Sequence, residues 1–307
     1  MTNNKAILIA GPTACGKSKL AIELAKKIDG VVINADSMQV YQDLNILTAR
    51  PQLADLAIAP HRLYGFVPGE ETYSVGRFVE DAGAIIAECN ETRQIPILVG
   101  GTGLYFKALL DGLSPIPPIP PAVRAHWRAE ADRIGSQKLY DVLSERDPEM
   151  AERLKPSDPQ RIVRALEVLD GTSQSLAYWQ SIPGVPTIES EAAIGIVVDP
   201  QRETVCRNSD LRLEWMVANG ALAEVATLMA KQLDPAAPIM RALGVQPLMA
   251  HLQNELSLDE AIAATKVETR HYIKRQLTWF KRNMISWKWL NEQQIESFKE
   301  NILQIIE

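Results

Sequence analysis

Short apolar runs alternate with helical patterns along the chain. The runs span residues 7–10, 31–36, 95–99 and 194–199, and each has the length of a buried strand. Between the first three runs, apolar residues recur at helical spacing, as over residues 20–28 and 75–86. Continuously apolar strands that alternate with helices are typical of a parallel sheet covered on both faces. The pattern therefore predicts an α/β fold.

The pattern changes in the middle of the chain. Residues 114–121 contain five prolines in eight positions, which predicts a stiff, extended linker. Residues 122–177 are highly charged and helical in period, and the Pro-Gly-Val-Pro sequence at 183–186 ends this stretch. The next apolar run belongs with the first sheet. We therefore predict a core formed by residues 1–113 and 190–307, interrupted by a helical insertion domain at 114–189.

Composition narrows the function classes. With 307 residues, 46% hydrophobic content and a net charge of −6, the chain is globular, and nucleic-acid binding would depend on local basic patches. The cysteines, Cys15, Cys89 and Cys206, are far apart, which argues against a disulfide framework or a zinc site and is typical of a cytoplasmic protein. No apolar run reaches the ~18 residues of a membrane span, so we expect no membrane partner.

A glycine-rich motif follows the first apolar run directly. Residues 11–18 read G-P-T-A-C-G-K-S, the pattern of a phosphate-binding loop, between a predicted strand and a predicted helix. Such a loop points backbone N–H groups and a helix N-terminus at one anion. Lys17 adds a mobile charge, and the Ser18 hydroxyl is a candidate Mg²⁺ ligand. The predicted diphosphate-binding residues of the loop are Gly11, Pro12, Thr13, Ala14, Cys15, Gly16, Lys17 and Ser18.

A second motif distinguishes this chain from most proteins with such a loop. Residues 36–41 read D-S-M-Q-V-Y at the end of the second predicted strand. Together with the loop, they resemble the tRNA dimethylallyltransferase family. Further matches lie, in the family's order, at residues 47–51, 60–63, 99–105, 158–161 and 275–280. The resemblance spans nearly the whole chain and implies a P-loop NTPase-like parallel sheet.

The resemblance also implies a reaction. A dimethylallyl group passes from dimethylallyl diphosphate to the N6 amine of the adenosine 3′ of the anticodon, tRNA position 37, and pyrophosphate leaves. Mg²⁺ is the implied cofactor, the tRNA anticodon stem-loop is the implied partner, and we expect a monomer. A longer prenyl donor and the choice of tRNA species stay open.

Three side chains outside the loop are candidate catalytic residues, together with Lys17 and Ser18. Asp36 ends a strand and faces the phosphates, which suits a general base that withdraws the amine proton. The alternatives are a helix cap or a residue that hydrogen-bonds to a ligand of the magnesium ion. Thr102 is placed by the resemblance near both substrates, although its spacing suits a helix N-cap equally. Arg212 matches a family arginine that would bind the diphosphate bidentately, with a surface helix arginine as the alternative.

Predicted tRNA contacts follow the resemblance. They comprise Asp36, Ser37, Met38, Gln39, Thr102, Arg124, Gln160, Arg161, Ile162, Val163 and Arg164. A basic helix around residues 270–282 also carries aromatic side chains, which we assign to the core, with stacking on RNA bases as the alternative. Asn45, Leu47 and Arg50 depart from the family pattern, which affects the expected detail of tRNA contact and leaves the reaction itself unchanged.

Other functions are compatible with parts of the pattern. A small-molecule kinase would use the same loop on ATP, with Asp199 as a magnesium-binding residue. A non-catalytic RNA-binding protein and a transferase acting on free adenine nucleotides are further alternatives; the insertion favours a large tRNA substrate. The loop cysteine, Cys15, lies beside Lys17 and a helix N-terminus, so we expect a lowered pKa for its thiol.

Overall fold

The computed structural model describes residues 5–306. Six strands form one sheet in the order β3-β2-β4-β1-β5-β6, and every neighbouring pair is parallel. The predicted α/β fold with a parallel sheet is confirmed. The strands are β1 (Ala6–Ala10), β2 (Gly30–Asn34), β3 (His61–Arg62), β4 (Ile95–Gly100), β5 (Ala193–Val198) and β6 (Lys288–Leu290). The edge strands β3 and β6 are too short to give a sequence signal.

Alternate side chains of each strand enter two separate apolar cores. Leu8, Ile33 and Leu98 belong to one core, whereas Ile7 and Ile9 belong to the other. Helices α1 (Lys17–Ile28) and α13 (Glu292–Ile306) contribute to the second core, and α3 (Val75–Thr92) and α4 (Gly103–Asp111) contribute to the first. Burial on both faces explains why the strands are continuously apolar.

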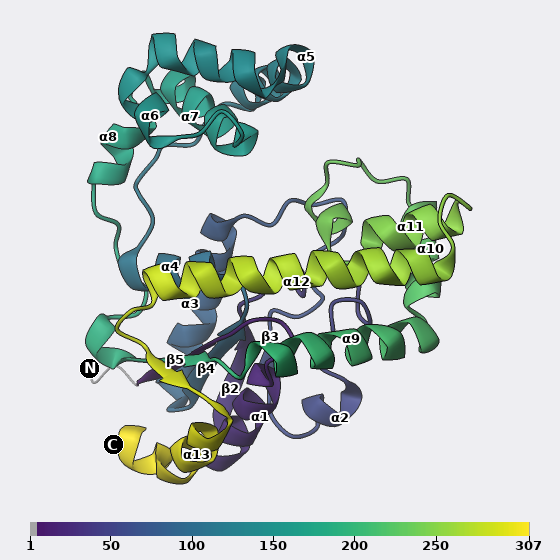
Figure 1. Ribbon diagram of the computed structural model, residues 1–307. Helices are drawn as coiled ribbons and strands as arrows, with labels where there is room; N and C mark the ends of the chain where they lie inside the picture. Colours follow the sequence, from purple (N-terminus) through teal and green to yellow (C-terminus); the bar gives the residue numbers. More distant parts are fainter. Residues whose placement is uncertain (1–4, 307) are drawn as a thin grey trace. The chain divides into compact units, whose positions relative to one another are not determined.

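The remaining helices of the core follow the insertion, apart from the short α2 (Leu53–Leu56). Helix α12 (Leu258–Asn283) forms a long rod and runs beside α9 (Arg202–Ala218) (Figure 1). It begins in a capping box between Ser257 and Glu260, which satisfies orphan N–H groups at its first turn. The other elements are η1 (Ser190–Ala192), α10 (Ala221–Ala230), η2 (Pro238–Arg241) and α11 (Val245–Leu252).

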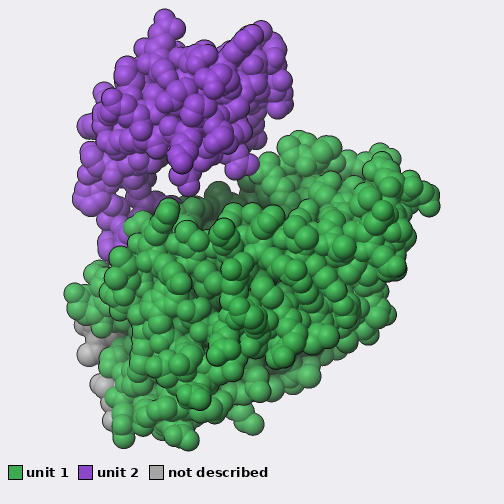
Figure 2. All heavy atoms as spheres, in the orientation of Figure 1, with its two compact units in different colours: residues 1–110, 187–307 green, residues 111–186 purple. Residues whose placement is uncertain are grey.

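The chain divides into two compact units, coloured separately in Figure 2. Unit 1 comprises Met1–Leu110 and Thr187–Glu307, and unit 2 comprises Asp111–Pro186. These boundaries lie three residues before the predicted ones. Unit 2 has an apolar core of its own around Trp127 and Leu166. Its helices are α5 (Pro121–Arg146), kinked at Gly135, α6 (Pro148–Arg153), α7 (Pro159–Thr172) and α8 (Leu176–Ser181).

Residues 112–120, between α4 and α5, form no regular secondary structure, in agreement with the prediction of an extended proline-rich linker. Across residues 5–306, no helix is both long and apolar enough to cross a lipid bilayer.

Candidate active site at the carboxyl edge of the sheet

Three loops that carry predicted site residues lie at the same edge of the sheet. The phosphate loop follows β1, the Asp36 turn follows β2, and the Gly101–Thr102 segment follows β4. These strands are parallel neighbours, with Ala10 opposite Gly100 and Asn34 opposite Val99. Ligands of open α/β sheets bind at this edge. The topology therefore brings together side chains from three separate segments of the sequence.

The phosphate loop has the backbone that its glycines permit. Gly16 adopts a left-handed conformation with φ of 90° directly before α1. Gly11 packs closely, since a Cβ there would lie 2.6 Å from Cys15 Sγ and 3.0 Å from the Val198 carbonyl oxygen. Lys17 Nζ donates to the Pro12 carbonyl at 3.1 Å and so spans the loop. The loop is shaped as a cradle at a helix N-terminus, which suits an anion.

A cavity of about 260 Å³ opens at this cradle. Arg212 and Asn208 of α9 also line it. Its lining residues are Ala14, Gly16, Lys17, Ser18, Lys19, Asn208 and Arg212. Two lysines and an arginine around one cavity favour a ligand with several negative charges, such as a diphosphate.

The expectation for Cys15 is wrong. The thiol is buried, and burial raises its pKa above the ordinary value, although Lys17 and Arg212 act in the opposite direction. Desolvation of the thiolate therefore outweighs the neighbouring positive charges. A thiol buried in this way is typical of a small packing residue, and the lowered pKa expected from the position beside Lys17 is not found.

The Asp36 carboxylate is held in a short turn. Its Oδ1 accepts the Met38 backbone N–H at 2.9 Å, and its backbone N–H donates to Asn34 Oδ1 at 2.9 Å. Asn34 is fully buried, and its Nδ2 donates to the carbonyls of Asp36 and Leu63 at 3.0 and 2.9 Å. Asn34 thus ties the turn to the segment after β3. Asn34 was not among the predicted site residues, although it lies in the apolar run that leads to Asp36.

Replacing Asn34 by alanine is expected to destabilise the protein by about 2–3 kcal/mol, since it leaves buried backbone groups unpaired. The same change should lower kcat, because the Asp36 turn loses its support. Denaturant unfolding and turnover measure the two effects. Asn301→Ala, at an exposed position within α13, is the control. Unchanged unfolding free energy in Asn34→Ala would contradict this account of the turn.

Thr102 contacts the same turn. Its hydroxyl oxygen accepts the Ser37 N–H at 3.0 Å and lies 3.3 Å from Ser37 Oγ. The Thr102 N–H donates to the Ala35 carbonyl at 3.2 Å. The close approach depends on Gly100, where a Cβ would lie 2.0 Å from the Ala35 carbonyl oxygen. Thr102 is therefore placed to hold the Asp36–Ser37 backbone.

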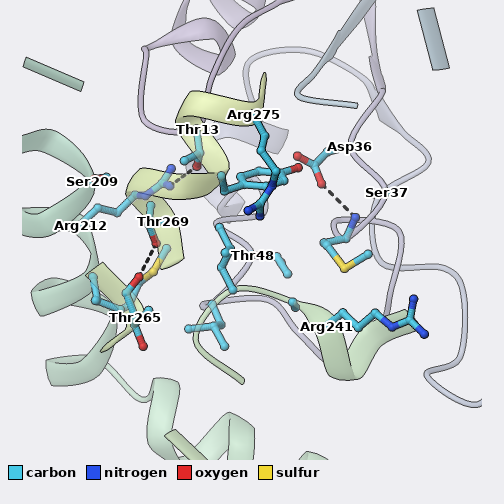
Figure 3. Close-up of a pocket in the computed structure, with 17 residues that line it drawn as sticks. Thr13, Asp36, Ser37, Thr48, Ser209, Arg212, Arg241, Thr265, Thr269 and Arg275 are labelled. Atoms are coloured by element: carbon cyan, nitrogen blue, oxygen red, sulfur yellow. Dashed lines mark hydrogen bonds between the residues drawn. The ribbon is translucent and has the colours of Figure 1, made fainter. Parts of the chain in front are cut away.

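A second cavity, of about 230 Å³, lies between the Asp36 turn and helices α9 and α12 (Figure 3). Arg212 lines both this cavity and the phosphate cradle, and its Nη2 donates to Thr13 Oγ1. Burial lowers the pKa of Arg212, while Cys15 and Asp36 raise it. Arg212 therefore stands between a phosphate-shaped cradle and a cavity that contains the carboxylate. A surface role for this arginine does not fit.

Apolar side chains form one part of the lining of the second cavity, beside polar ones such as Ser209, Thr265 and Thr269. Leu47, Leu213, Met216, Ala242 and Leu243 contribute to that lining. A small branched hydrocarbon fits such a lining. Tyr272 and Arg275 of α12 also reach the cavity, and the Arg275 guanidinium lies over the Tyr272 ring at 5.7 Å.

Two polar side chains position the loop that carries Leu47. Glu224 accepts hydrogen bonds from the backbone N–H groups of Asn45, Ile46 and Leu47. Gln39 donates through Nε2 to the carbonyls of Thr48 and Ala49 at 2.9 and 3.0 Å. Gln39, predicted to contact tRNA, therefore has its amide N–H groups engaged within the protein. Glu224 lies in no motif that we recognised.

Few of the described side chains near the phosphate cradle are suited to bind a magnesium ion. Among the described residues, no group of three or more His, Cys, Asp or Glu side chains is arranged to hold a metal. The Ser18 hydroxyl is at the first turn of α1, beside the phosphate cradle. Mg²⁺ usually keeps several waters and binds through one or two protein oxygens plus substrate phosphates. The donor set fits an ion brought in with a diphosphate.

The other predicted tRNA contacts lie in unit 2. Arg124 is exposed on α5, and Gln160 and Arg161 are exposed at the start of α7. Asp158 caps α7 and pairs with Arg161 at 3.3 Å, and Arg164 lies 3.4 Å from the buried Glu167. Val163 is half-buried.

The prediction for Ile162 needs correction. This side chain is fully buried in the core of unit 2, so it cannot contact RNA and instead anchors the helix that carries the arginines. The aromatic side chains assigned to the core differ in their surroundings. Phe280 is fully buried, whereas Tyr272 lines the second cavity.

Comparison with known proteins assigns the family. Residues 39–283 match the family described as IPP transferase, and residues 4–65 match the family described as isopentenyl transferase. A tRNA dimethylallyltransferase of Rhodopseudomonas palustris is 47% identical over 97% of this chain and 93% of its own length. One of Methylocella silvestris is 49% identical over 95% of this chain and 96% of its own length. The chain belongs to the tRNA dimethylallyltransferase family.

Solved structures of the family have the same fold. The tRNA isopentenylpyrophosphate transferase of Bacillus halodurans aligns with a TM-score of 0.70 at 31% identity, covering 99% of this chain and 97% of that one. A eukaryotic dimethylallyltransferase acting on tRNA aligns with a TM-score of 0.84 at 27% identity, covering 98% and 77%. The family resemblance and the transferase class predicted from the sequence motifs are confirmed.

Proposed function

We propose that this protein transfers a dimethylallyl group from dimethylallyl diphosphate to the N6 amine of adenosine 37 in tRNA. The observation that carries this proposal is Arg212, an arginine shared by two cavities. One cavity has the cationic lining that a diphosphate requires. The other combines an apolar lining with the Asp36 carboxylate, which suits an allylic carbon and an amine nucleophile.

The leaving group would be stabilised by charge and by oriented donors. Pyrophosphate forms as the bond between its oxygen and the allylic carbon breaks, and negative charge develops on that oxygen. Lys17, Arg212 and the backbone N–H groups of residues 14–18 would surround the pyrophosphate in the cradle. Mg²⁺, held by Ser18 and the phosphate oxygens, would supply further neutralisation of charge when bound.

The nucleophile is the adenine amine, whose lone pair is delocalised into the ring. Its attack on the allylic carbon forms the N–C bond, and the amine then loses a proton. Asp36 Oδ1 already accepts one hydrogen bond from Met38, which orients the carboxylate and leaves Oδ2 for the proton. Thr102 would support this arrangement through its hydrogen bond to Ser37.

Binding of the tRNA would require residues of the insertion as well as residues of the core. Arg124, Gln160, Arg161 and Arg164 of unit 2 present donors suited to the RNA backbone, and the anticodon stem-loop is the part of tRNA that holds adenosine 37. Because that base is stacked, it must be extruded to reach a carboxylate. We propose that the protein acts as a monomer. A tRNA substrate and three unpaired cysteines favour the cytoplasm.

The experiment is incorporation of radiolabelled dimethylallyl diphosphate, with Mg²⁺, into unmodified tRNA that reads codons beginning with U. Free AMP and ATP serve as alternative acceptors in parallel reactions. We expect label in the tRNA alone. Label in free nucleotide would indicate a transferase for small acceptors, and consumption of ATP without label in any acceptor would indicate a kinase.

A further inference from the structure

A buried glutamine joins the two loops that carry the proposed chemistry. Gln276 lies on the inner face of α12 and is 6% exposed. Its Oε1 accepts the backbone N–H of Thr13 in the phosphate loop at 3.0 Å. Its Nε2 donates to the Gly101 carbonyl, directly before Thr102, at 3.0 Å. One side-chain amide therefore connects the loop after β1 with the loop after β4.

The surrounding backbone is shaped for this contact. A Cβ on Gly101 would lie 2.2 Å from Gln276 Nε2, so only glycine leaves room for the amide. One turn further along α12, Trp279 covers Gly103, where a Cβ would lie 2.1 Å from Cζ3 of the indole. Glycines 101 and 103, on either side of Thr102, thus accommodate α12.

From this amide, hydrogen bonds and the adjoining backbone lead to Arg212 on one side and to Ser37, next to Asp36, on the other. On one side, the Thr13 hydroxyl oxygen accepts a hydrogen bond from the Arg212 guanidinium. On the other side, Thr102 follows Gly101 and accepts the N–H of Ser37, next to Asp36. The position of a Gly101 Cβ would also lie 3.5 Å from Asp36 Oδ2, so the carboxylate is close to the amide.

We propose that Gln276 is a positioning residue for the transfer and sets the separation between the diphosphate cradle and the Asp36–Thr102 site. This inference rests on the proposed function. The amine, the allylic carbon and the departing oxygen must lie in line, and small misplacements of reacting groups cost large factors in rate. Helix α12 is held by apolar side chains such as Phe280 and Ile273, so losing the amide should shift loops and leave the helix docked.

Two variants test the proposal, both measured in the full chain with tRNA and dimethylallyl diphosphate. Gln276→Met keeps the length of the side chain and removes both hydrogen bonds. We expect kcat to fall, KM for dimethylallyl diphosphate to rise, and kcat/KM to drop by about 10- to 100-fold. Gln42→Met is the matched control, since it removes a glutamine hydrogen bond to the Phe66 carbonyl outside both loops. We expect this control to retain wild-type constants.

Gln276→Glu distinguishes the contributions of the two hydrogen bonds, because it keeps one and removes the other. A carboxylate still accepts the Thr13 N–H, but its second oxygen faces the Gly101 carbonyl and the Asp36 carboxylate, which repel it. When protonated, the introduced carboxyl group would instead donate to the Gly101 carbonyl, as the amide does. We therefore expect KM for dimethylallyl diphosphate close to the wild-type value. The ratio of the variant's kcat to that of the wild type should rise as pH falls.

The outcomes are distinguishable. Wild-type kcat and KM in Gln276→Met, per folded molecule determined from thermal unfolding, would overturn the positioning role. A pH-independent ratio of the Gln276→Glu kcat to the wild-type kcat would also overturn the positioning role. This second test applies even if Gln276→Met does not fold. Absence of prenyl transfer by the unaltered protein would overturn the proposed function instead, before any variant is compared.

Discussion

Replacing Asp36 by asparagine is expected to lower kcat by about 10²- to 10⁴-fold, the range that general-base catalysis contributes. The asparagine Oδ1 can still accept the Met38 N–H, so the turn should keep its shape. What is lost is the acceptor for the amine proton. Single-turnover transfer to tRNA measures the rate, and a filter-binding titration should show an unchanged Kd for tRNA.

A second carboxylate provides the control. Asp199 follows β5 at the same edge of the sheet, and burial raises its pKa. A kinase that used Asp199 for magnesium would lose activity in Asp199→Asn, whereas the transferase should retain most of its kcat. Near-normal turnover of Asp36→Asn, together with a large loss in Asp199→Asn, would remove Asp36 from the mechanism.

The second large effect is expected at Arg212. Arg212→Ala should reduce kcat/KM for dimethylallyl diphosphate by about 10²- to 10³-fold, comparable with the loss of one preorganised donor at a developing anion. The side chain lines both cavities and is hydrogen-bonded to Thr13 Oγ1, whereas Lys17 and Lys19 line only the phosphate cradle, so neither lysine is placed to replace it. Steady-state kinetics over a range of diphosphate concentrations measure the effect.

Arg212→Lys should recover little of this loss, because an ammonium cannot reproduce the fork of donors that contacts Thr13 and a phosphate together. Arg207→Ala, on the same helix, is the matched control. Equal losses at Arg207 and Arg212 would show that general charge on α9, rather than the position of Arg212, determines diphosphate use.

The sheet and the phosphate loop could be predicted from the sequence because local pattern determines them. Strands 7–10 and 95–99 are continuously apolar, and the loop needs glycine at position 16, where φ is 90°. Proximity of Asp36 to the loop followed from parallel pairing of β1, β4 and β2, since adjacent parallel strands end at one edge.

Residues whose hydrogen-bond partners lie far away in the sequence could not be predicted from a local pattern. The Asn34 amide bonds to a carbonyl 29 residues away, and Gln276, although it lies in the family match at residues 275–280, bonds to a partner 263 residues away. Glu224 caps a loop near residue 46 from another helix. The thiol of Cys15 was misjudged for a related reason: Lys17 is adjacent in sequence, whereas the residues that bury the thiol come from elsewhere in the fold.

The most direct test of the central claim is the identity of the product. After reaction of unmodified tRNA with dimethylallyl diphosphate, the tRNA would be digested to nucleosides and analysed by mass spectrometry, with pyrophosphate measured in parallel. The account predicts one N6-dimethylallyl adenosine per tRNA, equimolar pyrophosphate, and no product when adenosine 37 is replaced by guanosine. Prenylation at another position, or pyrophosphate released without a prenylated nucleoside, would contradict it.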